Sequence, residues 1–279
     1  LKSGYWQCPM DPDSVEKTAF ITHQGLYQYK VMPFGLCNAP GVFQRLMQEI
    51  LHDVIGKYVM VYIDDIVIYS KTEAEHEAHT KVVLERLIEA GLTLKSSKCT
   101  FDAREVKLLG FVVNEAGIQT NPEKVSAIKN LAPPRTLKEL RRFLGMSGYY
   151  RTCVRDYAAI SASLTELMKK GVVWKWTEAH QRSFDALKEA LVSSEVIAYP
   201  DPTKPYKLFT DSSDYALGSV LCQTVDGVEK VIQYVSKKLN PAQRKWAVIE
   251  KEAWAVVYSL KKLRPYLYGA EFTIYTDHK

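Results

Sequence analysis

The sequence lacks any apolar stretch long enough to cross a membrane as a helix. Its most apolar run, residues 58–69, carries Asp64 and Asp65 and falls short of the ~20 residues that a transmembrane helix needs. The five cysteines are odd in number, scattered and without CxxC spacing, which argues against a zinc site and favours reduced thiols. No secretory signal opens the chain, so we expect an intracellular, cytoplasmic protein with no membrane partner.

Charge is unevenly distributed along the 279 residues, which carry +5 in total and are 47% hydrophobic. Residues 1–118 have a net charge of −3 and residues 176–279 of +1, whereas residues 119–175 hold eleven Lys and Arg against four Asp and Glu, giving +7. A basic segment of this kind is typical of proteins with a polyanionic partner. Charge alone leaves a solvated basic surface as an equal alternative.

The first 118 residues combine strand patterns with helical periodicity. A helix is predicted from Asn38 to Gly56, and a second follows the capping box Thr72-x-x-Glu75. Leu108 to Val113 is predicted to be one further strand. This pattern predicts an α+β unit in which an antiparallel sheet is backed by helices.

The rest of the chain changes pattern twice. Residues 119–172 contain short capped helices and predict a helical subdomain, and residues 173–203 form a connection. Residues 204–279 then show three strands, a helix and a strand, which predicts the start of a second, α/β domain.

Tyr62-Ile63-Asp64-Asp65 is the sharpest chemical signal in the sequence. Adjacent carboxylates repel each other, so two of them between apolar strand-forming runs favour a hairpin tip at which a divalent cation neutralises them. The alternative is an acidic turn in water, and the apolar residues on both sides make it the weaker interpretation.

The motifs, taken together, resemble the reverse transcriptase and ribonuclease H region of long-terminal-repeat retrotransposons of the Ty3/Gypsy class. They occur in family order across nearly the whole chain: residues 1–7, 17–20, 31–40, 43–44, 62–65, 108–111, 140–145, 148–150, 210–213 and 276–279. The resemblance implies a reverse transcriptase palm with part of the fingers over residues 1–118, a thumb over 119–172, and a ribonuclease H-like domain over 204–279.

This resemblance also implies roles at the polymerase site. Asp64 and Asp65 match carboxylates that hold two Mg²⁺ ions, with Mn²⁺ as a substitute, for nucleotidyl transfer. Tyr5 matches the aromatic residue that excludes a 2′-hydroxyl; without the family it would be taken for a core aromatic. Phe34 and Gly35 match the segment lining the nucleotide pocket.

Further matches concern the nucleic acid. Leu109 and Gly110 match the hairpin that positions the primer end, although a strand glycine also allows a close backbone approach. Among the thumb's basic residues, Arg141, Arg142 and Arg151 are expected to contact template–primer phosphates. The implied partners are an RNA template, a DNA primer, an RNA/DNA hybrid, deoxynucleoside triphosphates and other parts of a Pol polyprotein, within a cytoplasmic retrotransposon particle.

Asp211, Glu252 and Asp277 match three metal-binding carboxylates of a ribonuclease H site. Taken singly, each would be interpreted as a solvated acid. Glu250 is excluded because it projects roughly 200° away from Glu252 on a helix.

Two other sets of residues are predicted to carry no chemistry. His76 and His79 are assigned to a solvated helix face rather than to a metal. Trp174 and Trp176 are assigned to packing rather than to base stacking.

The family pattern continues beyond both ends of this sequence. An Asp that would precede Leu1, and a fourth ribonuclease H acid after Lys279, are expected to complete the two sites. The sequence is therefore interpreted as part of a polymerase-nuclease. The alternative is a host-retained remnant that binds nucleic acid without catalysis.

Overall fold

The computed structural model describes residues 1–277 and divides the chain into two compact units, Leu1–Ala103 and Arg104–Lys279. The division falls earlier than residue 118, because the strands after residue 104 pack with elements that come later in the chain. The expected boundaries at residues 172 and 203 stay predictions.

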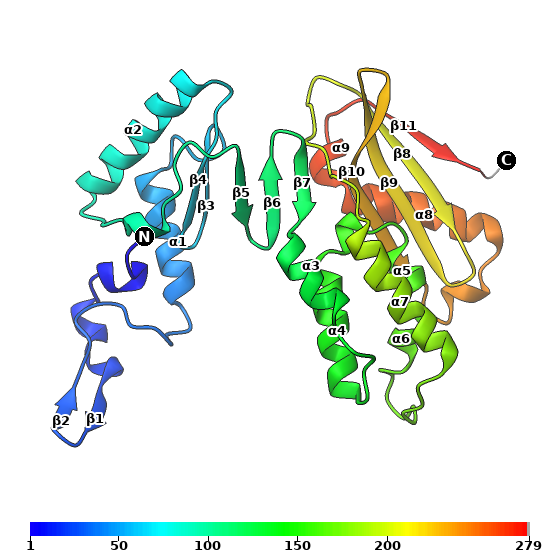
Figure 1. Ribbon diagram of the computed structural model, residues 1–279, viewed down its shortest axis with the longest axis horizontal. Helices are drawn as coiled ribbons and strands as arrows, with labels where there is room; N and C mark the ends of the chain where they lie inside the picture. Colours follow the sequence, from blue (N-terminus) through cyan, green and yellow to red (C-terminus); the bar gives the residue numbers. More distant parts are fainter. Residues whose placement is uncertain (278–279) are drawn as a thin grey trace. The chain divides into compact units, whose positions relative to one another are not determined.

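The first unit contains two α-helices and two hairpins, together with short 3-10 helices at Gly4–Gln7, Pro12–Ser14, Glu16–Thr18 and Ser96–Lys98 (Figure 1). Its elements are β1 (Phe20–Thr22), β2 (Gly25–Tyr27), α1 (Ala39–Ile50), β3 (Val59–Tyr62), β4 (Asp65–Ile68) and α2 (Glu73–Glu89). Thr72 caps α2 as predicted, since its Oγ1 accepts a hydrogen bond from the Glu75 N–H at 3.2 Å, but the Glu75 carboxylate accepts from the Lys71 N–H rather than from that of Thr72, so the capping box is only half formed. Helix α1 starts as predicted but ends at Ile50 rather than at Gly56, because the chain turns back through hydrogen bonds such as Val54 N to Leu51 O at 3.1 Å.

A single apolar cluster holds this unit together. Phe43, Met47 and Leu51 are fully buried and pack with residues of β3 and α2, including Val59 and Leu87. The helical spacing of the three residues places them on one face, and burying that face fixes α1 behind the β3–β4 hairpin.

The second unit begins with a three-stranded antiparallel sheet: β5 (Glu105–Leu108), β6 (Phe111–Asn114) and β7 (Gly117–Thr120). The expectation of one strand from Leu108 to Val113 is wrong, because the chain reverses at Leu109–Gly110 and Leu108 pairs with Phe111. Both turn residues have positive φ, 49° and 80°, which a continuous strand cannot contain.

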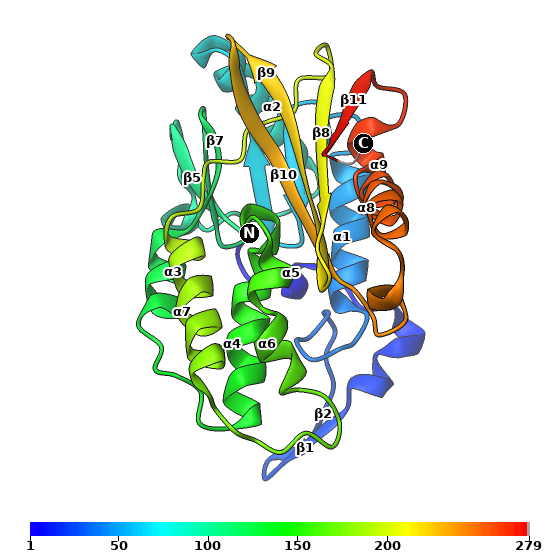
Figure 2. The same ribbon diagram turned by 90° about the vertical axis from the view of Figure 1, so that its right-hand side faces the viewer.

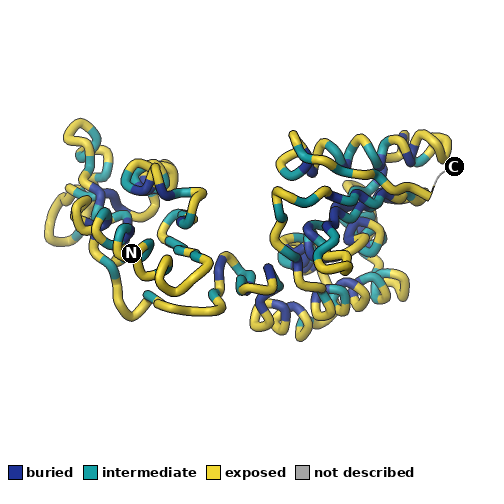
Figure 3. Tube along the Cα trace, turned by 90° about the horizontal axis from the view of Figure 1, so that it is seen from above, coloured by how far each residue is buried: buried dark blue, intermediate teal, exposed yellow. Residues whose placement is uncertain are grey.

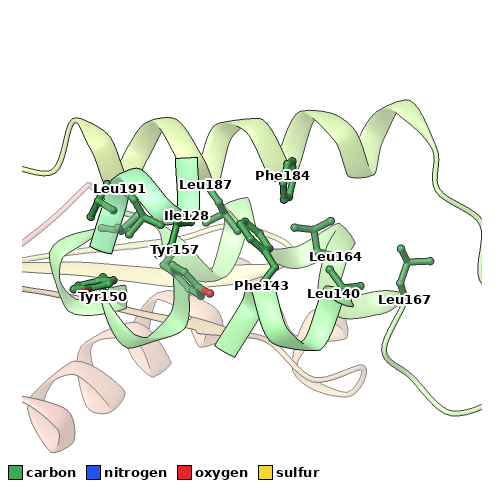
Figure 4. Close-up of a cluster of buried hydrophobic side chains, with 12 residues drawn as sticks. Ile128, Leu140, Phe143, Tyr150, Tyr157, Leu164, Leu167, Phe184, Leu187 and Leu191 are labelled. Carbon is green, nitrogen blue, oxygen red and sulfur yellow. The ribbon is translucent and has the colours of Figure 1, made fainter. Parts of the chain in front are cut away.

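A helical layer comes next, consisting of α3 (Pro122–Lys129), α4 (Leu137–Tyr149), α5 (Tyr157–Ile160), α6 (Ala162–Glu166) and α7 (Glu178–Val192). These helices lie together below the four-stranded sheet formed by β8 (Tyr206–Ser212) to β11 (Phe272–Thr276) of the same unit (Figure 2). Phe184, Leu187 and Leu191 of α7 meet Phe143 and Tyr157 in their shared core (Figure 4). Trp174 and Trp176 pack against this core, which confirms that they serve packing.

The chain then forms a four-stranded sheet in the order β10-β9-β8-β11. Its elements are β8 (Tyr206–Ser212), β9 (Ala216–Val225), β10 (Val228–Lys238), α8 (Val248–Lys262), α9 (Arg264–Leu267) and β11 (Phe272–Thr276). β11 runs parallel to β8, whereas the other neighbours are antiparallel. Neighbouring residues Leu221 and Cys222 point to opposite faces of β9 and are both buried, so the sheet is covered on both sides (Figure 3).

Candidate functional site

The turn between β3 and β4 is held by Gln44 of α1. The Gln44 side chain donates to the Val61 carbonyl at 3.3 Å and accepts from the Ile63 N–H at 2.7 Å. These bonds support Ile63 at a φ of 53°, which is uncommon for a β-branched residue. Asp64 and Asp65 follow it, and both are exposed. The predicted hairpin tip is thus confirmed, while the role of Gln44 at the turn was missed by sequence reasoning.

Gly4 lies directly beneath Asp64. A Cβ atom at Gly4 would overlap Oδ1 of Asp64 and would lie 2.8 Å from Cζ of Phe43. The buried Gly4 therefore leaves space for the Asp64 side chain and the Phe43 ring, and a larger residue would have to displace them.

Tyr5 and Phe34, which the sequence assigned to nucleotide binding, lie next to each other. The Tyr5 ring centroid is 5.3 Å from that of Phe34 and 5.6 Å from that of Phe43. Phe34 is 61% exposed, and Gly35 follows it with a φ of 96°. Tyr5 is thus half-buried with a ring on either side, an arrangement that restricts its movement.

The three arginines assigned to phosphate binding occupy two kinds of environment. Arg141 and Arg142 are exposed on α4 and have no ion-pair partner within residues 1–277. Arg151, by contrast, donates a hydrogen bond of 2.8 Å to the carbonyl of Ser236 on β10, and its guanidinium lies 6.0 Å from the Tyr157 ring centroid. Arg151 therefore joins the helical layer to the four-stranded sheet.

Three carboxylates meet at one end of the four-stranded sheet. Asp211 lies near the end of β8, Glu252 lies on α8, and Asp277 directly follows β11. One ligand oxygen from each lies within 4.8 Å of the others. β8 and β11 are parallel neighbours, with Thr210 opposite Thr276. Asp211 and Asp277, which follow these threonines, therefore lie at the same end of the sheet, where both strands finish.

Glu252 differs from the other two acids because it is only 7% exposed. Its Oε1 accepts a hydrogen bond of 2.5 Å from Oγ of Ser212. Its Oε2 is inaccessible and has no hydrogen-bond partner among the described residues. A buried carboxylate oxygen without a partner is costly, and a divalent cation shared with Asp211 and Asp277 would satisfy it. The donor set therefore fits a hard cation such as Mg²⁺.

The two residues before Glu252 in the α8 sequence stabilise the helix and the loop beside it. Glu250 accepts from the Ala247 N–H at 2.8 Å, so it caps α8. Lys251 is 5% exposed and forms an ion pair of 2.7 Å with Asp214, which fastens the loop after β8 to α8. Sequence spacing had not revealed the roles of Ser212 and Lys251, because both depend on contacts between distant segments.

His76 and His79 are not on a freely solvated face, and this prediction is wrong. Both Nδ1 atoms lie within hydrogen-bond distance of Oγ of Ser70, at 3.3 and 2.8 Å, and the His79 ring stacks on Tyr58 at 3.7 Å. These contacts half-bury both rings. The two histidines thus attach α2 to the base of the β3–β4 hairpin.

Family comparisons assign most of the chain. Residues 1–113 match the family described as reverse transcriptase (RNA-dependent DNA polymerase), and residues 176–274 match the RNase H-like domain found in reverse transcriptase. No helix within residues 1–277 is long and apolar enough to cross a membrane.

Whole-length relatives agree with these matches. The chain is 42% identical to the retrovirus-related Pol polyprotein from transposon opus and 37% identical to that from transposon gypsy, both of Drosophila melanogaster. It is 36% identical to the transposon Tf2-3 polyprotein of Schizosaccharomyces pombe. All of this chain is covered in each case, but the chain spans only 29%, 28% and 21% of these relatives.

Solved structures extend the likeness to the fold. A foamy viral protease-reverse transcriptase dRH in complex with double-stranded DNA has a TM-score of 0.90 and 27% identity, covering all of this chain and 49% of that one. A foamy viral protease-reverse transcriptase in complex with an RNA/DNA hybrid has a TM-score of 0.85, also at 27% identity, with 38% of that chain covered. The predicted fold class is therefore confirmed. The chain belongs to the reverse transcriptase and ribonuclease H-like region of Gypsy-type retrotransposon Pol polyproteins.

Proposed function

We propose that this chain supplies residues of two metal-dependent sites, one for RNA-directed DNA synthesis and one for hydrolysis of the RNA strand in an RNA/DNA hybrid. The observation that carries the second activity is the convergence of the Asp211, Glu252 and Asp277 carboxylates within 4.8 Å of one another, in which Glu252 has a buried Oε2 without a hydrogen-bond partner among the described residues. The two matched families generally use divalent metals, and we assign Mg²⁺, with Mn²⁺ as a substitute.

The chain's own residues would position the ions of the hydrolytic site. Asp211 and Asp277 are exposed and offer their oxygens from the sheet edge, whereas Ser212 orients Glu252 from behind. When bound, the metals lower the pKa of the attacking water and stabilise charge on the phosphate. The protein's contribution is a fixed set of oxygen ligands beside solvent, where a hybrid strand has access.

The polymerase site is assigned on the β3–β4 turn. Asp64 and Asp65 project from a turn that Gln44 fixes, so their oxygens are available to ions that bind a primer 3′-hydroxyl and an incoming triphosphate. Tyr5 is assigned to exclusion of the 2′-hydroxyl, because Phe34 and Phe43 restrict its movement.

The substrates follow from the same assignment. An RNA template, a DNA primer and deoxynucleoside triphosphates serve the polymerase site, with Leu109 and Gly110 at the primer end and Arg141 and Arg142 on backbone phosphates. Other parts of a Pol polyprotein, and a retrotransposon particle in the cytoplasm, are the proposed setting.

Metal binding tests the hydrolytic part of the proposal. Titration of the chain with Mn²⁺, measured by calorimetry, is expected to show binding that Asp211→Asn weakens strongly. Metal-dependent cleavage of a hybrid is measured for an opus Pol polyprotein in which this chain replaces the matching segment, and Asp211→Asn is expected to abolish that cleavage. Equal Mn²⁺ binding by the unchanged chain and Asp211→Asn would remove the carboxylate cluster from the proposal.

Primer extension tests the polymerase part. Extension of the primer is measured on a primed RNA template. The two proteins compared are this chain and an opus Pol polyprotein in which this chain replaces the matching segment. Activity is expected to vanish with Asp64→Asn or Asp65→Asn.

The exposed, unpaired Arg141 and Arg142 favour a second candidate function, nucleic-acid binding without catalysis. Salt-sensitive binding of a hybrid, without metal-dependent cleavage or extension in either protein, would support that function instead.

A further inference from the structure

The turn between β5 and β6 has an unfavourable backbone conformation. Leu109 and Gly110 are its two central residues, with φ values of 49° and 80°. A two-residue hairpin with positive φ at both positions normally has Asn or Asp before the Gly, because a bulky residue is strained there. Leu109 is also 39% exposed. Burial of its side chain is therefore not the force that holds the turn.

Two consecutive tyrosines hold the turn from the end of α4. The hydroxyl of Tyr149 donates a hydrogen bond to the carbonyl of Leu109, and that of Tyr150 donates to the carbonyl of Gly110 at 2.9 Å. The ring of Phe111 packs against both tyrosine rings, with centroid distances of 5.5 Å to Tyr149 and 5.3 Å to Tyr150. Each carbonyl of the strained turn thus accepts a hydrogen bond from a tyrosine 40 positions away, and the carbonyl of Gly110 also accepts one from the Asn121 N–H at 3.2 Å.

The two tyrosines contribute in different ways. Tyr150 is 4% exposed, and its burial raises the pKa of its hydroxyl, which extends the pH range over which this group stays a donor. Tyr149 is 53% exposed and lies on the surface beside the turn. Arg142 precedes Tyr149 by seven residues, so the two side chains share a face of α4.

We propose that Tyr149 and Tyr150 are positioning residues that keep the Leu109–Gly110 turn in its left-handed conformation and join it to α4. The turn and the face of α4 that carries Arg142 then form one rigid surface for the primer strand. This inference rests on the proposed function, which places the turn at the primer end. Backbone strain that is maintained by surrounding contacts is often associated with functional sites, and the two hydroxyls are those contacts here.

The first experiment follows amide hydrogen exchange in the full chain. Tyr149→Phe and Tyr150→Phe each remove a hydroxyl and keep the ring, and a neutral hydrogen bond corresponds to roughly a fivefold change in an opening equilibrium. We therefore expect exchange to accelerate about fivefold in each variant, and more in the double variant, at Phe111, which pairs with Leu108 across the turn, and at Asn121, whose N–H donates to the Gly110 carbonyl at 3.2 Å. Exchange in β8, β9 and β10 is expected to stay unchanged.

A second measurement addresses the primer. The chain is mixed with a primed template that carries 2-aminopurine at the primer 3′ end or, in a separate sample, well upstream. The double variant is expected to change the fluorescence of the terminal probe and to leave the upstream probe as it is. Leu109→Gly should partly reverse both effects, because glycine adopts positive φ without strain.

Tyr157→Phe is the matched control. The Tyr157 hydroxyl bonds Oγ of Ser147 at 2.8 Å in the same helical core and does not contact the turn. It is expected to lower stability without changing exchange at the turn or the terminal probe signal.

Unchanged exchange at Phe111 and Asn121 in the double variant would overturn the inference. So would faster exchange with an unchanged terminal probe signal. If the unchanged chain binds no primed template at all, the proposed function fails, and the exchange data still decide whether the tyrosines hold the turn.

Discussion

Ser212 donates a hydrogen bond of 2.5 Å to Oε1 of Glu252, across 40 residues of sequence. Ser212 is the last residue of β8, and Glu252 lies one turn into α8. The bond occupies one carboxylate oxygen and leaves Oε2, which has no protein partner within the part of the chain that the structure describes. The Ser212 hydroxyl thus holds one of the two carboxylate oxygens of Glu252.

Ser212→Ala is expected to weaken Mn²⁺ binding about 10–100-fold, because partners that orient metal ligands typically contribute that much. Ser212→Thr keeps a hydroxyl and should bind Mn²⁺ nearly as well as the unchanged chain. Isothermal titration calorimetry of the full chain measures both. Identical affinities for the alanine variant and the unchanged chain would show that Ser212 does not orient Glu252.

Gln44→Ala should loosen the turn that carries Asp64 and Asp65. Removing the two hydrogen bonds to Val61 and Ile63 is expected to cost about 1–2 kcal/mol of stability. Urea unfolding measures this cost, and hydrogen exchange at the Ile63 amide localises it. Gln48→Ala, an exposed position one turn further along α1, serves as the control and should stay within about 0.5 kcal/mol.

Replacing Arg141 and Arg142 with Ala should weaken binding to a primed template and flatten its salt dependence. The slope of log K against log salt is expected to fall by about 0.9 for each phosphate that the protein no longer neutralises. Fluorescence anisotropy across a salt titration measures the slope. An unchanged slope would remove α4 from the interface.

Arg151→Ala is expected to behave differently from the other two arginine variants. Its hydrogen bond to Ser236 lies inside the second unit, so removing it should destabilise the fold by about 1.5–3 kcal/mol. Denaturant unfolding of the three arginine variants compares how much each change lowers the free energy of unfolding. A reduced binding affinity with full stability would instead place Arg151 on the phosphates.

Acid should weaken the attachment of α6 to β10 through Glu166. Lys169 and Lys238, which bond its carboxylate, lower the pKa of Glu166 to about 2. A lowered folded-state pKa stabilises the fold above the unfolded value of about 4.5, and this stability is lost as pH falls from there towards 2.

Glu166→Gln should therefore reduce stability near neutral pH and flatten its decline below pH 4.5. Thermal unfolding across pH measures this effect. Glu178 is an exposed glutamate that forms no ion pair within residues 1–277. Glu178→Gln should therefore lose stability at acid pH in the same way as the unchanged chain. If Glu166→Gln lost as much stability at acid pH as the unchanged chain, Glu166 would not be the group that makes stability depend on acid pH.

Local sequence signals predicted much of the fold. The capping box at Thr72 places the start of α2, and apolar periodicity predicts α1 and the strands after residue 204. Residue type and chain order were enough to select Asp211, Glu252 and Asp277, because strand ends and a helix face follow from short-range pattern. Whether those acids meet depended on the parallel pairing of β8 with β11, a long-range contact.

The sequence by itself determined the family, the order of elements and the acids that carry the chemistry, because each is written in short motifs. Only the tertiary structure decided which groups support them. The apolar pattern placed Leu109–Gly110 within a strand and the family resemblance placed it in a hairpin, but neither indicated that hydroxyls from Tyr149 and Tyr150 hold the turn. Gln44 and Ser212 likewise act through hydrogen bonds between distant segments, and such bonds leave no periodic trace in a sequence.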